Sequence, residues 1–463
     1  MPDAKPNIIF ILTDDQGPWA AGCYGNPEIR TPNIDRLAAT GMRFDRFFCA
    51  SPVCSPSRAS FLTGTVPSRH GVHDWIREGN YGDRPATYLE GQTGYTSILA
   101  DNGWTCGISG KWHLGNSVLP QQGFSHWFVH KTGGGPYNDA PMIRDGELFN
   151  APGYVTNVIT DDALDYIDTH ATDDSPFYLS VHYTAPHSPW TGHPQDIVDS
   201  YDDCPFESCP QEPIHPWAGN LTKNSHGNRE MLKGYFAAVT AMDLDVGRIL
   251  DKLEAKGIRD NTLVVFTSDN GFSCGHHGFW GKGNGTYPIN MYDNSVLVPF
   301  LASHPGRIPQ GTSSDAMISA IDFKPTLLDY TGLPAPEGLN LPGQSFVANL
   351  TGENSDLRDA VVIYDEYGPT RMARTREWKY VHRYGEGPNE LFDLVNDPDE
   401  RVNRADDPSL KTRIEELRGV LEDWYSTVST AEKDGKDLPV TGGGQLRPVG
   451  GSWEDGSDAF GRH

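Results

Sequence analysis

Three short, predominantly apolar runs stand out along the chain. They span residues 7–13, 177–181 and 262–267. Unbroken apolar runs, rather than alternating ones, are typical of strands that are buried on both faces of a parallel sheet. The pattern therefore predicts several central strands, far apart in the sequence, that share one sheet.

Helical patterns separate these strands. A first helix is predicted to begin with Thr31 as its cap and Pro32 in its first turn, and to end at Gly41. A longer helix is predicted from Glu230 to Lys256, where apolar residues recur along one stripe. Strands that alternate with helices indicate an α/β sheet with helices on both faces.

The pattern changes after about residue 355. Short strands are predicted at 360–364, 378–382 and 390–394. An amphipathic helix then carries apolar residues at helical spacing from Leu410 to Trp424. The tail from Asp434 is rich in glycine and polar residues, and we expect it either to lie over the surface or to be disordered.

The length of 463 residues fits one large domain and a smaller one. We predict a catalytic α/β domain at 1–355. Residues 356–463 are predicted to form an α+β subdomain with a short antiparallel sheet, one amphipathic helix and the Gly-rich tail. The 50 glycines and 35 prolines imply long loops, on which active sites are often built.

The net charge of the chain limits the kinds of molecule that it is expected to bind. Its 62 acidic and 37 basic residues give a net charge of -25, which argues against nucleic acid or an anionic membrane as a partner. An anionic substrate would be repelled at long range, so local cations or a metal ion would be needed to bind it. Alternatively, the acidic residues serve only to keep the protein soluble.

Seven scattered cysteines indicate neither a disulfide framework nor a zinc site. Cys204 and Cys209 either close a small loop or stay reduced. The N-terminus does not resemble a signal peptide, and no apolar stretch is long enough to span a bilayer. We therefore expect no membrane partner and a cytoplasmic protein, or a periplasmic or secreted one if a leader has been removed.

Two of the apolar strands end in pairs of oxygen ligands, Asp14-Asp15 and Asp269-Asn270. Ligands of open α/β sheets bind beyond the carboxyl ends of the strands, so both pairs can converge on one point. Neighbouring residues reach one ion only if the strand has already turned. Carboxylate and amide oxygens suit Ca²⁺ or Mg²⁺ better than zinc, although such residues also end many ordinary strands.

The run Cys54-Ser55-Pro56-Ser57-Arg58 places a potential nucleophile beside a permanent cation. Pro56 restricts the backbone, and Ser57 is predicted to cap a helix whose N-terminal amides would face an anion at Cys54. The alternative is a buried structural cysteine next to a surface arginine.

This run, with Leu62-Thr63-Gly64 downstream, resembles the signature of the type I, formylglycine-dependent sulfatases of the alkaline-phosphatase-like superfamily. The resemblance spans most of the chain and implies a large mixed, mostly parallel sheet flanked by helices. In that family a formylglycine-generating enzyme oxidises the cysteine to Cα-formylglycine. The resemblance also implies a set of metal ligands, namely Asp14, Asp15, Cys54, Asp269 and Asn270.

Three further motifs resemble those of the family, and each supplies a candidate catalytic side chain. They are Gly110 to Gly115, with Lys111 and His113; Thr184 to Pro189, with His187; and Trp280 to Gly283, with Lys282. The resemblance implies that a hydroxyl of hydrated residue 54 attacks sulfur while the substrate alcohol leaves. His113 would then act as the base that releases sulfate. His187 and Lys282 would assist the leaving oxygen, while Arg58 and Lys111 hold the sulfate.

The substrate beyond the sulfate group is less constrained. His73, Asp74 and Trp75 are candidates to contact a sugar, although Trp75 could equally pack in the core. His276 and His277 are a second candidate rim. We expect a sulfated carbohydrate, as a small molecule or an oligosaccharide. A small aryl or alkyl sulfate, a phosphodiester or phosphonate monoester, and a non-catalytic carbohydrate-binding role are the alternatives. The oligomeric state stays open.

Overall fold

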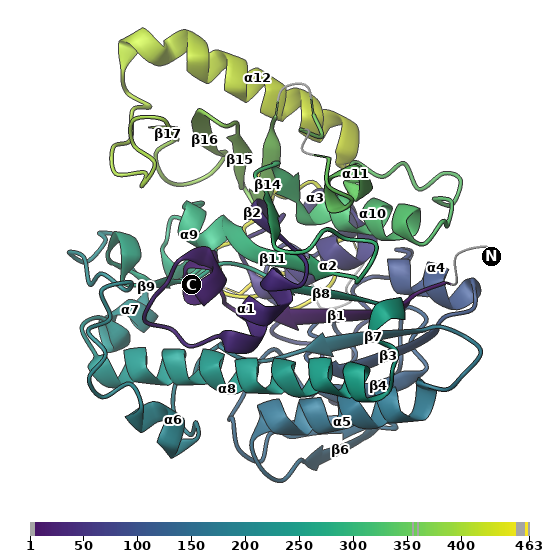
Figure 1. The fold of residues 1–463 in the computed structure, drawn as a ribbon. Helices are drawn as coiled ribbons and strands as arrows, with labels where there is room; N and C mark the ends of the chain where they lie inside the picture. The colour runs from purple at the N-terminus through teal and green to yellow at the C-terminus, as the bar shows by residue number, and fades with distance from the viewer. Residues whose placement is uncertain (1–4, 354–355, 359–360, 451–458, 462–463) are drawn as a thin grey trace.

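The computed structural model of the protein describes residues 5–353, 356–358, 361–450 and 459–461, and a large sheet lies at its centre (Figure 1). The strands of this sheet are β1 (Asn7–Thr13), β2 (Met42–Phe48), β3 (Thr105–Gly110), β4 (His126–His130), β5 (Pro141–Arg144), β6 (Glu147–Asn150), β7 (Phe177–His182), β8 (Thr262–Ser268), β11 (Leu297–Ser303), β12 (Thr312–Ser314) and β13 (Ile318–Ser319). Their order is β12-β2-β11-β8-β1-β7-β3-β4-β5-β6, with β13 also paired to β2. A separate small ribbon joins β9 (Ser273–Cys274) to β10 (Trp280–Gly281).

The three strands predicted from apolar runs lie together at the centre of this sheet. β1 pairs in parallel with β7 on one side and with β8 on the other. All seven residues of β1 are buried, as the unbroken apolar run requires. β3 and β4 extend the parallel part, whereas β11, β5 and β6 pair antiparallel. The predicted mixed, mostly parallel sheet is confirmed.

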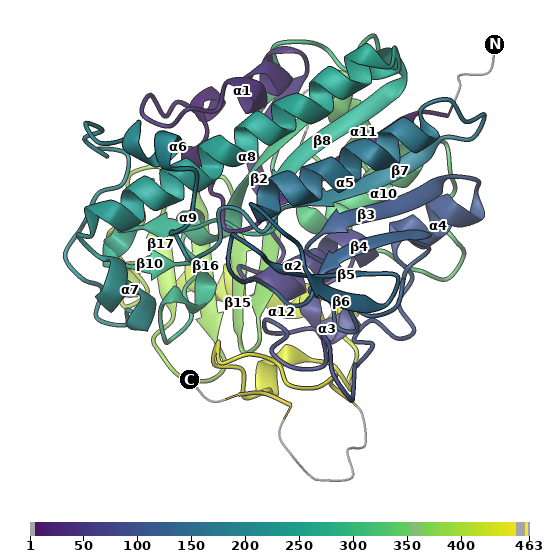
Figure 2. The same ribbon diagram turned by 90° about the horizontal axis from the view of Figure 1, so that it is seen from below.

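Helices cover both faces of the sheet. One face carries α1 (Pro32–Ala39), α5 (Val155–His170) and α8 (Arg229–Ala255), which are seen in Figure 2. The other carries α2 (Cys54–Thr63), α4 (Tyr95–Asp101) and α10 (Phe323–Tyr330). The shorter helices are α3 (Pro67–His70), α6 (Gln195–Asp199), α7 (Asn220–Ser225), α9 (Asp293–Val296) and α11 (Val347–Leu350). Both helices predicted from the pattern are present, with ends shifted by one or two residues.

A four-stranded antiparallel sheet follows near the C-terminus. Its strands, in order, are β14 (Ile363–Tyr367), β15 (Thr370–Arg374), β16 (Trp378–Arg383) and β17 (Glu390–Asp393), and α12 (Lys411–Val428) packs against it. β14 begins three residues later than predicted, because Val361 has a φ of 46°, which is incompatible with a strand. Residue 360 lies outside the described residues. β15 was not predicted.

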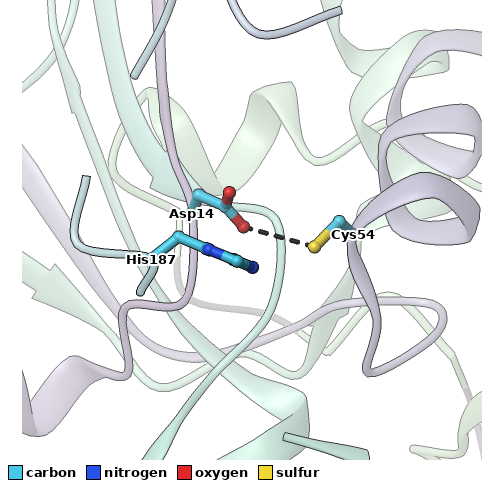
Figure 3. Close-up of side chains that lie close together, drawn as sticks. All are labelled: Asp14, Cys54 and His187. Carbon is cyan, nitrogen blue, oxygen red and sulfur yellow. Dashed lines mark hydrogen bonds between the residues drawn. The ribbon is translucent and has the colours of Figure 1, made fainter. Parts of the chain in front are cut away.

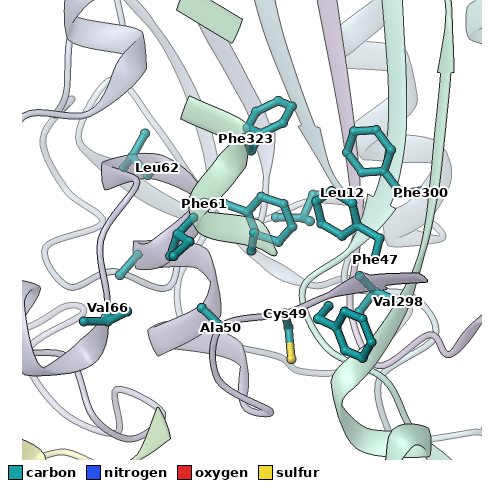
Figure 4. Packing of buried hydrophobic residues seen from close by; sticks show 14 of the residues in the cluster. Leu12, Phe47, Cys49, Ala50, Phe61, Leu62, Val66, Val298, Phe300 and Phe323 are labelled. Atoms are coloured by element: carbon teal, nitrogen blue, oxygen red, sulfur yellow. The ribbon is translucent and has the colours of Figure 1, made fainter. Parts of the chain in front are cut away.

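One continuous hydrophobic core joins the two sheets through α2. It contains Phe10 of β1, Phe61 of α2, Met372 of β15 and Tyr425 of α12. Figure 4 shows the aromatic packing around Phe61, whose ring is stacked 6.0 Å from that of Phe47. Helix α2, which begins at Cys54, is therefore packed against residues of both sheets. The division of the chain at residue 355 stays a prediction.

The described part of the C-terminal tail lies over the protein. Gln445 is fully buried there, and its backbone pairs with Ile76. The seven cysteines, all among the described residues, are free thiols, including Cys204 and Cys209. Within the described part of the chain, every helix is too short or too polar to cross a membrane.

Candidate active site

The ends of β1 and β8 bring the predicted carboxylates together. Thr13 lies opposite Ser268, so Asp14 and Asp269 leave the sheet side by side. Asp15 adopts a left-handed φ of 69°, which is the turn that two adjacent ligands need. Carboxylate oxygens of all three aspartates lie within 4.8 Å of one another, and all three residues are buried.

Asn270 completes this group of oxygen atoms. Its amide nitrogen donates to Asp15 Oδ1 at 2.8 Å and to the Gly271 carbonyl at 2.9 Å. Its Oδ1 atom is buried and has no hydrogen-bond partner among the described residues. A buried orphan oxygen beside three carboxylates fits a hard divalent cation, because carboxylate and amide oxygens are the ligands that such ions bind and a buried acceptor without a partner is costly.

Helix α2 holds Cys54 opposite these oxygens. Cys54 is the first residue of the helix, and its Sγ lies 3.3 Å from Asp14 Oδ1, to which it donates (Figure 3). The prediction that Ser57 caps the helix is wrong, because Val53 occupies the cap position. The Ser57 hydroxyl instead donates to the backbone carbonyl of Asp269, which ties the helix to the end of β8.

Three cations neutralise the three carboxylates. Arg58 Nε donates to Asp269 Oδ2 at 2.8 Å, and Lys111 Nζ donates to Asp14 Oδ2 at 2.5 Å. Lys282 Nζ contacts Asp15 Oδ1 and lies 2.8 Å from the sulfur of Cys54. These predicted residues come from α2, from the loop after β3 and from the loop after β10. The structure therefore gathers them at one point.

Burial and charge set the protonation of this group. Burial raises the pKa of Asp14, but Lys111 and the other nearby cations outweigh it and hold that pKa well below its usual range. Burial and the charge of Asp14 raise the pKa of Asp269 to about 6. The same two causes raise the pKa of the Cys54 thiol to about 12. At neutral pH the encoded thiol is therefore protonated and a poor nucleophile.

Two histidines complete the predicted set. His113 Nε2 lies 2.9 Å from the carbonyl of Ile76 and donates to it, which leaves the buried Nδ1 without a partner among the described residues. His187 Nδ1 lies 2.7 Å from the Ser188 carbonyl, and its Nε2 lies 3.9 Å from Asp15 Oδ2. Burial lowers the pKa of both, although Asp14 and Asp15 oppose it at His187.

These side chains open onto a cavity of about 440 Å³. It is lined by four of the predicted catalytic residues, Cys54, His113, His187 and Lys282, and by Trp75, Ile76, Arg77, Thr132, Gly133, Gly134 and Asn284. Of the other seven lining residues, the sequence analysis identified only Trp75. The run Gly133-Gly134-Gly135 was the sequence feature that could have indicated part of this lining. A Cβ atom on Gly133 would lie 2.2 Å from the His113 ring, so only glycine fits there.

The residues predicted to bind substrate divide into two groups. Trp75 lines the cavity. His73 and Asp74 are fully buried instead and hydrogen-bond to the C-terminal tail. The His277 ring is stacked 4.0 Å from that of Tyr292, and the His276 imidazole bonds to a backbone carbonyl. The structure does not bring these four side chains to the cavity.

Comparison with known proteins agrees with this geometry. The sequence model of the sulfatase family matches residues 6–333, and that of the C-terminal region of N-sulphoglucosamine sulphohydrolase matches 275–426. The chain is 27% identical to an N-acetylglucosamine-6-O-sulfatase of Bacteroides thetaiotaomicron, over 94% of this chain and 88% of that protein. It is 32% identical to an ulvan-active sulfatase of Formosa agariphila, over 90% of this chain and 80% of that one.

Solved structures share the fold. One, in complex with its substrate D-glucosamine-2-N,6-O-disulfate, matches with a TM-score of 0.79 and 26% identity over 94% of this chain and all of that one. The phosphonate monoester hydrolase of Agrobacterium radiobacter, at 21% identity over 91% of this chain and 96% of that one, shares the fold with a TM-score of 0.69. On these matches and the site geometry, the chain belongs to the sulfatase family, sulfuric ester hydrolases of the alkaline-phosphatase-like superfamily.

Proposed function

We propose that the protein hydrolyses a sulfate ester of a carbohydrate to the alcohol and inorganic sulfate. The observation that carries the proposal is the position of Cys54. It begins a buried helix at the cavity, where it contacts both Asp14 and Lys282. Its protonated thiol is unsuited to attack, whereas the same position suits a modified residue. The sulfatases of sugars among its relatives support a carbohydrate as the substrate.

We further propose that a formylglycine-generating enzyme converts Cys54 to Cα-formylglycine. The ligands proposed for a Ca²⁺ ion, or alternatively Mg²⁺, are Asp14, Asp15, Asp269, Asn270 and residue 54. The hydrate of formylglycine supplies the attacking hydroxyl, and the divalent cation supplies positive charge beside it. The buried orphan oxygen of Asn270 and the all-oxygen donor set favour a hard cation.

The cations of the chain hold the sulfate. Arg58 Nη2 is buried and has no partner among the described residues, so it has a free donor for a sulfate oxygen. Lys111 and Lys282 now contact the carboxylates that a metal ion would also bind. An ion on those carboxylates would leave both ammonium groups to the sulfate. Fixed positive charge of this kind stabilises the charge that moves through the transition state.

The two histidines are suited to proton transfer. The free Nδ1 of neutral His113 can accept a proton when sulfate is released. The Nε2 of His187 faces the carboxylates and Lys282, and because Nδ1 donates to the Ser188 carbonyl, the doubly protonated ring is the form that can deliver the Nε2 proton to the leaving alcohol oxygen. Gly133 lies directly over the His113 ring and restricts its orientation.

Mass spectrometry tests the modification. The tryptic peptide from Phe47 to Arg58 contains both Cys49 and Cys54, so tandem fragmentation must locate the change. We expect an aldehyde at position 54 and an intact thiol at 49 in active protein from its native host. Active protein with an unmodified Cys54 would contradict the mechanism.

Turnover of matched esters tests the reaction class. We expect the mature protein to hydrolyse a sulfated sugar faster than 4-nitrophenyl sulfate, and both much faster than the corresponding phosphate esters. A phosphodiester or phosphonate hydrolase, which the shared fold alone would allow, predicts the opposite order. A protein that binds sulfated sugar without turnover would support the non-catalytic alternative.

A further inference from the structure

The catalytic cavity continues into a second one. The second cavity also has a volume of about 440 Å³, and it meets the first at Arg77 and Thr132, which line both. Its walls are the segment 77–84 and Lys131. The two cavities therefore adjoin at Arg77 and Thr132. Each has a volume in the range of ordinary ligand sites, so together they have room for more than one sugar ring.

Unpaired positive charge marks this second cavity. Arg77, Arg84 and Lys131 line it, and none of the three has a carboxylate within salt-bridge distance among the described residues. Glu78 and Asp83 also line the cavity without forming a salt bridge to these cations, so the formal charge of its lining is positive by one unit. Three unpaired cations beside a binding site are notable in a chain whose net charge is -25.

An aromatic side chain accompanies the cations. Tyr81 lines the second cavity and is 38% exposed, and Lys131 Nζ lies 5.2 Å from the centre of its ring. Sugar rings pack against exposed aromatic faces, while arginine and lysine bind sulfate or carboxylate groups. The two acidic side chains can accept hydrogen bonds from sugar hydroxyls.

We propose that the second cavity binds a neighbouring, anionic sugar residue of the substrate, with its sulfate or carboxylate held by Arg77, Arg84 and Lys131. This inference rests on the proposed function and narrows it to an oligosaccharide with more than one anionic group. A small aryl sulfate would occupy the first cavity alone. The substrate preference would then be set by contacts remote from Cys54.

The test compares a long and a short ligand. Isothermal titration calorimetry measures the binding of inorganic sulfate, a heparin-derived tetrasaccharide and a carrageenan-derived tetrasaccharide to metal-loaded protein. We expect at least one tetrasaccharide to bind more tightly than sulfate. In Arg84→Gln/Lys131→Gln, the ratio of the tetrasaccharide dissociation constant to that of sulfate should rise about tenfold, because two charge contacts are lost.

The matched control is Lys411→Gln/Arg413→Gln, which removes the same two charges from exposed positions on α12. This control should leave the ratio unchanged. An unchanged ratio in the cavity variant, an equal rise in the control, or wild-type protein that binds neither tetrasaccharide more tightly than sulfate would overturn the inference. Failure of the proposed function would appear differently, as mature wild-type protein that turns over no sulfate ester.

Discussion

The protein buries two clusters of charge that are similar in composition but different in surroundings. The first, the site cluster, consists of Asp14, Asp15, Asp269, Arg58, Lys111 and Lys282. The second, the C-terminal cluster, lies where α9 meets β14 to β16 and consists of Asp293, Asp365, Glu400, Arg374 and Lys379. Each contains three carboxyl groups and at least two cations. Only the site cluster is known to border the cavity at Cys54.

In the C-terminal cluster, charges neutralise one another in direct pairs. Asp293 accepts from Arg374 at 2.7 Å and from Lys379 at 2.5 Å. Burial raises the pKa of Asp293, but these two cations outweigh it and hold the pKa well below its usual range. Burial raises the pKa of Asp365 well above its usual range, so this carboxyl stays protonated. The charges of this cluster are thus paired without any ligand, although both carboxyl oxygens of Asp365 lack a hydrogen-bond partner among the described residues.

The site cluster is also balanced, with three carboxylates and three cations, but its members have a second use. A divalent ion on the carboxylates would give the cluster a net charge of +2, which attracts a sulfate ester despite the acidic surface. This difference shows that buried ion pairs, by themselves, indicate a structural role and not a catalytic one. What distinguishes the site cluster is the cavity at Cys54, which Lys282 lines.

Removal of the nucleophile position should have the largest effect. Cys54→Ala should lower turnover of a sulfate ester by about 10⁴-fold or more, because no other group replaces the attacking hydroxyl. Its melting temperature should change little. Cys49→Ala, at an equally buried cysteine outside the site, is the control and should keep most of the turnover. Substantial turnover in Cys54→Ala would refute the assignment.

Substitution of one carboxylate in each cluster should distinguish an effect on catalysis from an effect on stability. Asp269→Ala should lose the divalent metal ion and turnover together, as measured by elemental analysis and kinetics. Asp293→Asn should keep metal and turnover in the folded protein but lose about 3 kcal/mol of stability, because buried Arg374 loses its carboxylate partner and Lys379 loses one of its two. Thermal melting of both variants checks this. If Asp293→Asn removed the metal, the two clusters would not be independent.

Much of the fold was predictable because its signal is local. β1, β7 and β8 are buried on both faces, so their sequences are predominantly apolar and do not alternate with exposed polar residues. β15 gave no such signal. It carries Arg371 and Arg374, which are buried and which Asp434 and Asp293 neutralise from elsewhere in the chain. A buried charge with a distant partner looks, in sequence, like an exposed one.

The active site, too, combines features that the sequence predicts with features that depend on tertiary contacts. The convergence of Asp14 with Asp269 followed from parallel topology, and the motif order located the cations. The fit of the Gly133 backbone against the His113 ring depends on tertiary contact, so sequence alone could not reveal it. The burial of His73 under the C-terminal tail depends on contacts more than 350 residues apart in sequence and was missed for the same reason.

A smaller change should misplace a catalytic histidine without removing it. Gly133→Ala forces the His113 ring away, since the added Cβ would lie 2.2 Å from it. A displacement of about 1 Å costs on the order of 100-fold in rate, so kcat should fall by that order while KM changes little. Gly419→Ala, at an open position in α12, is the control and should leave kcat unchanged. An unaltered kcat in Gly133→Ala would exclude close contact between this loop and the base.

The smallest expected effect concerns the tail that supports the site from outside. Gln445 accepts from the His73 backbone at 2.8 Å and donates to the Gly71 carbonyl at 3.0 Å. Its own backbone pairs with Ile76, whose carbonyl orients His113. Gln445→Ala should therefore lower stability by about 1–3 kcal/mol, because buried partners are left unsatisfied.

The same substitution should lower turnover by less than about tenfold, since the backbone contact to Ile76 survives it. Melting curves and the pH dependence of kcat provide the measurements. Lys436→Ala, at an exposed position of the same tail, controls for nonspecific effects. A loss of activity as large as that of Gly133→Ala would mean that the tail is part of the catalytic machinery. An unchanged melting temperature would mean that the tail merely covers the protein.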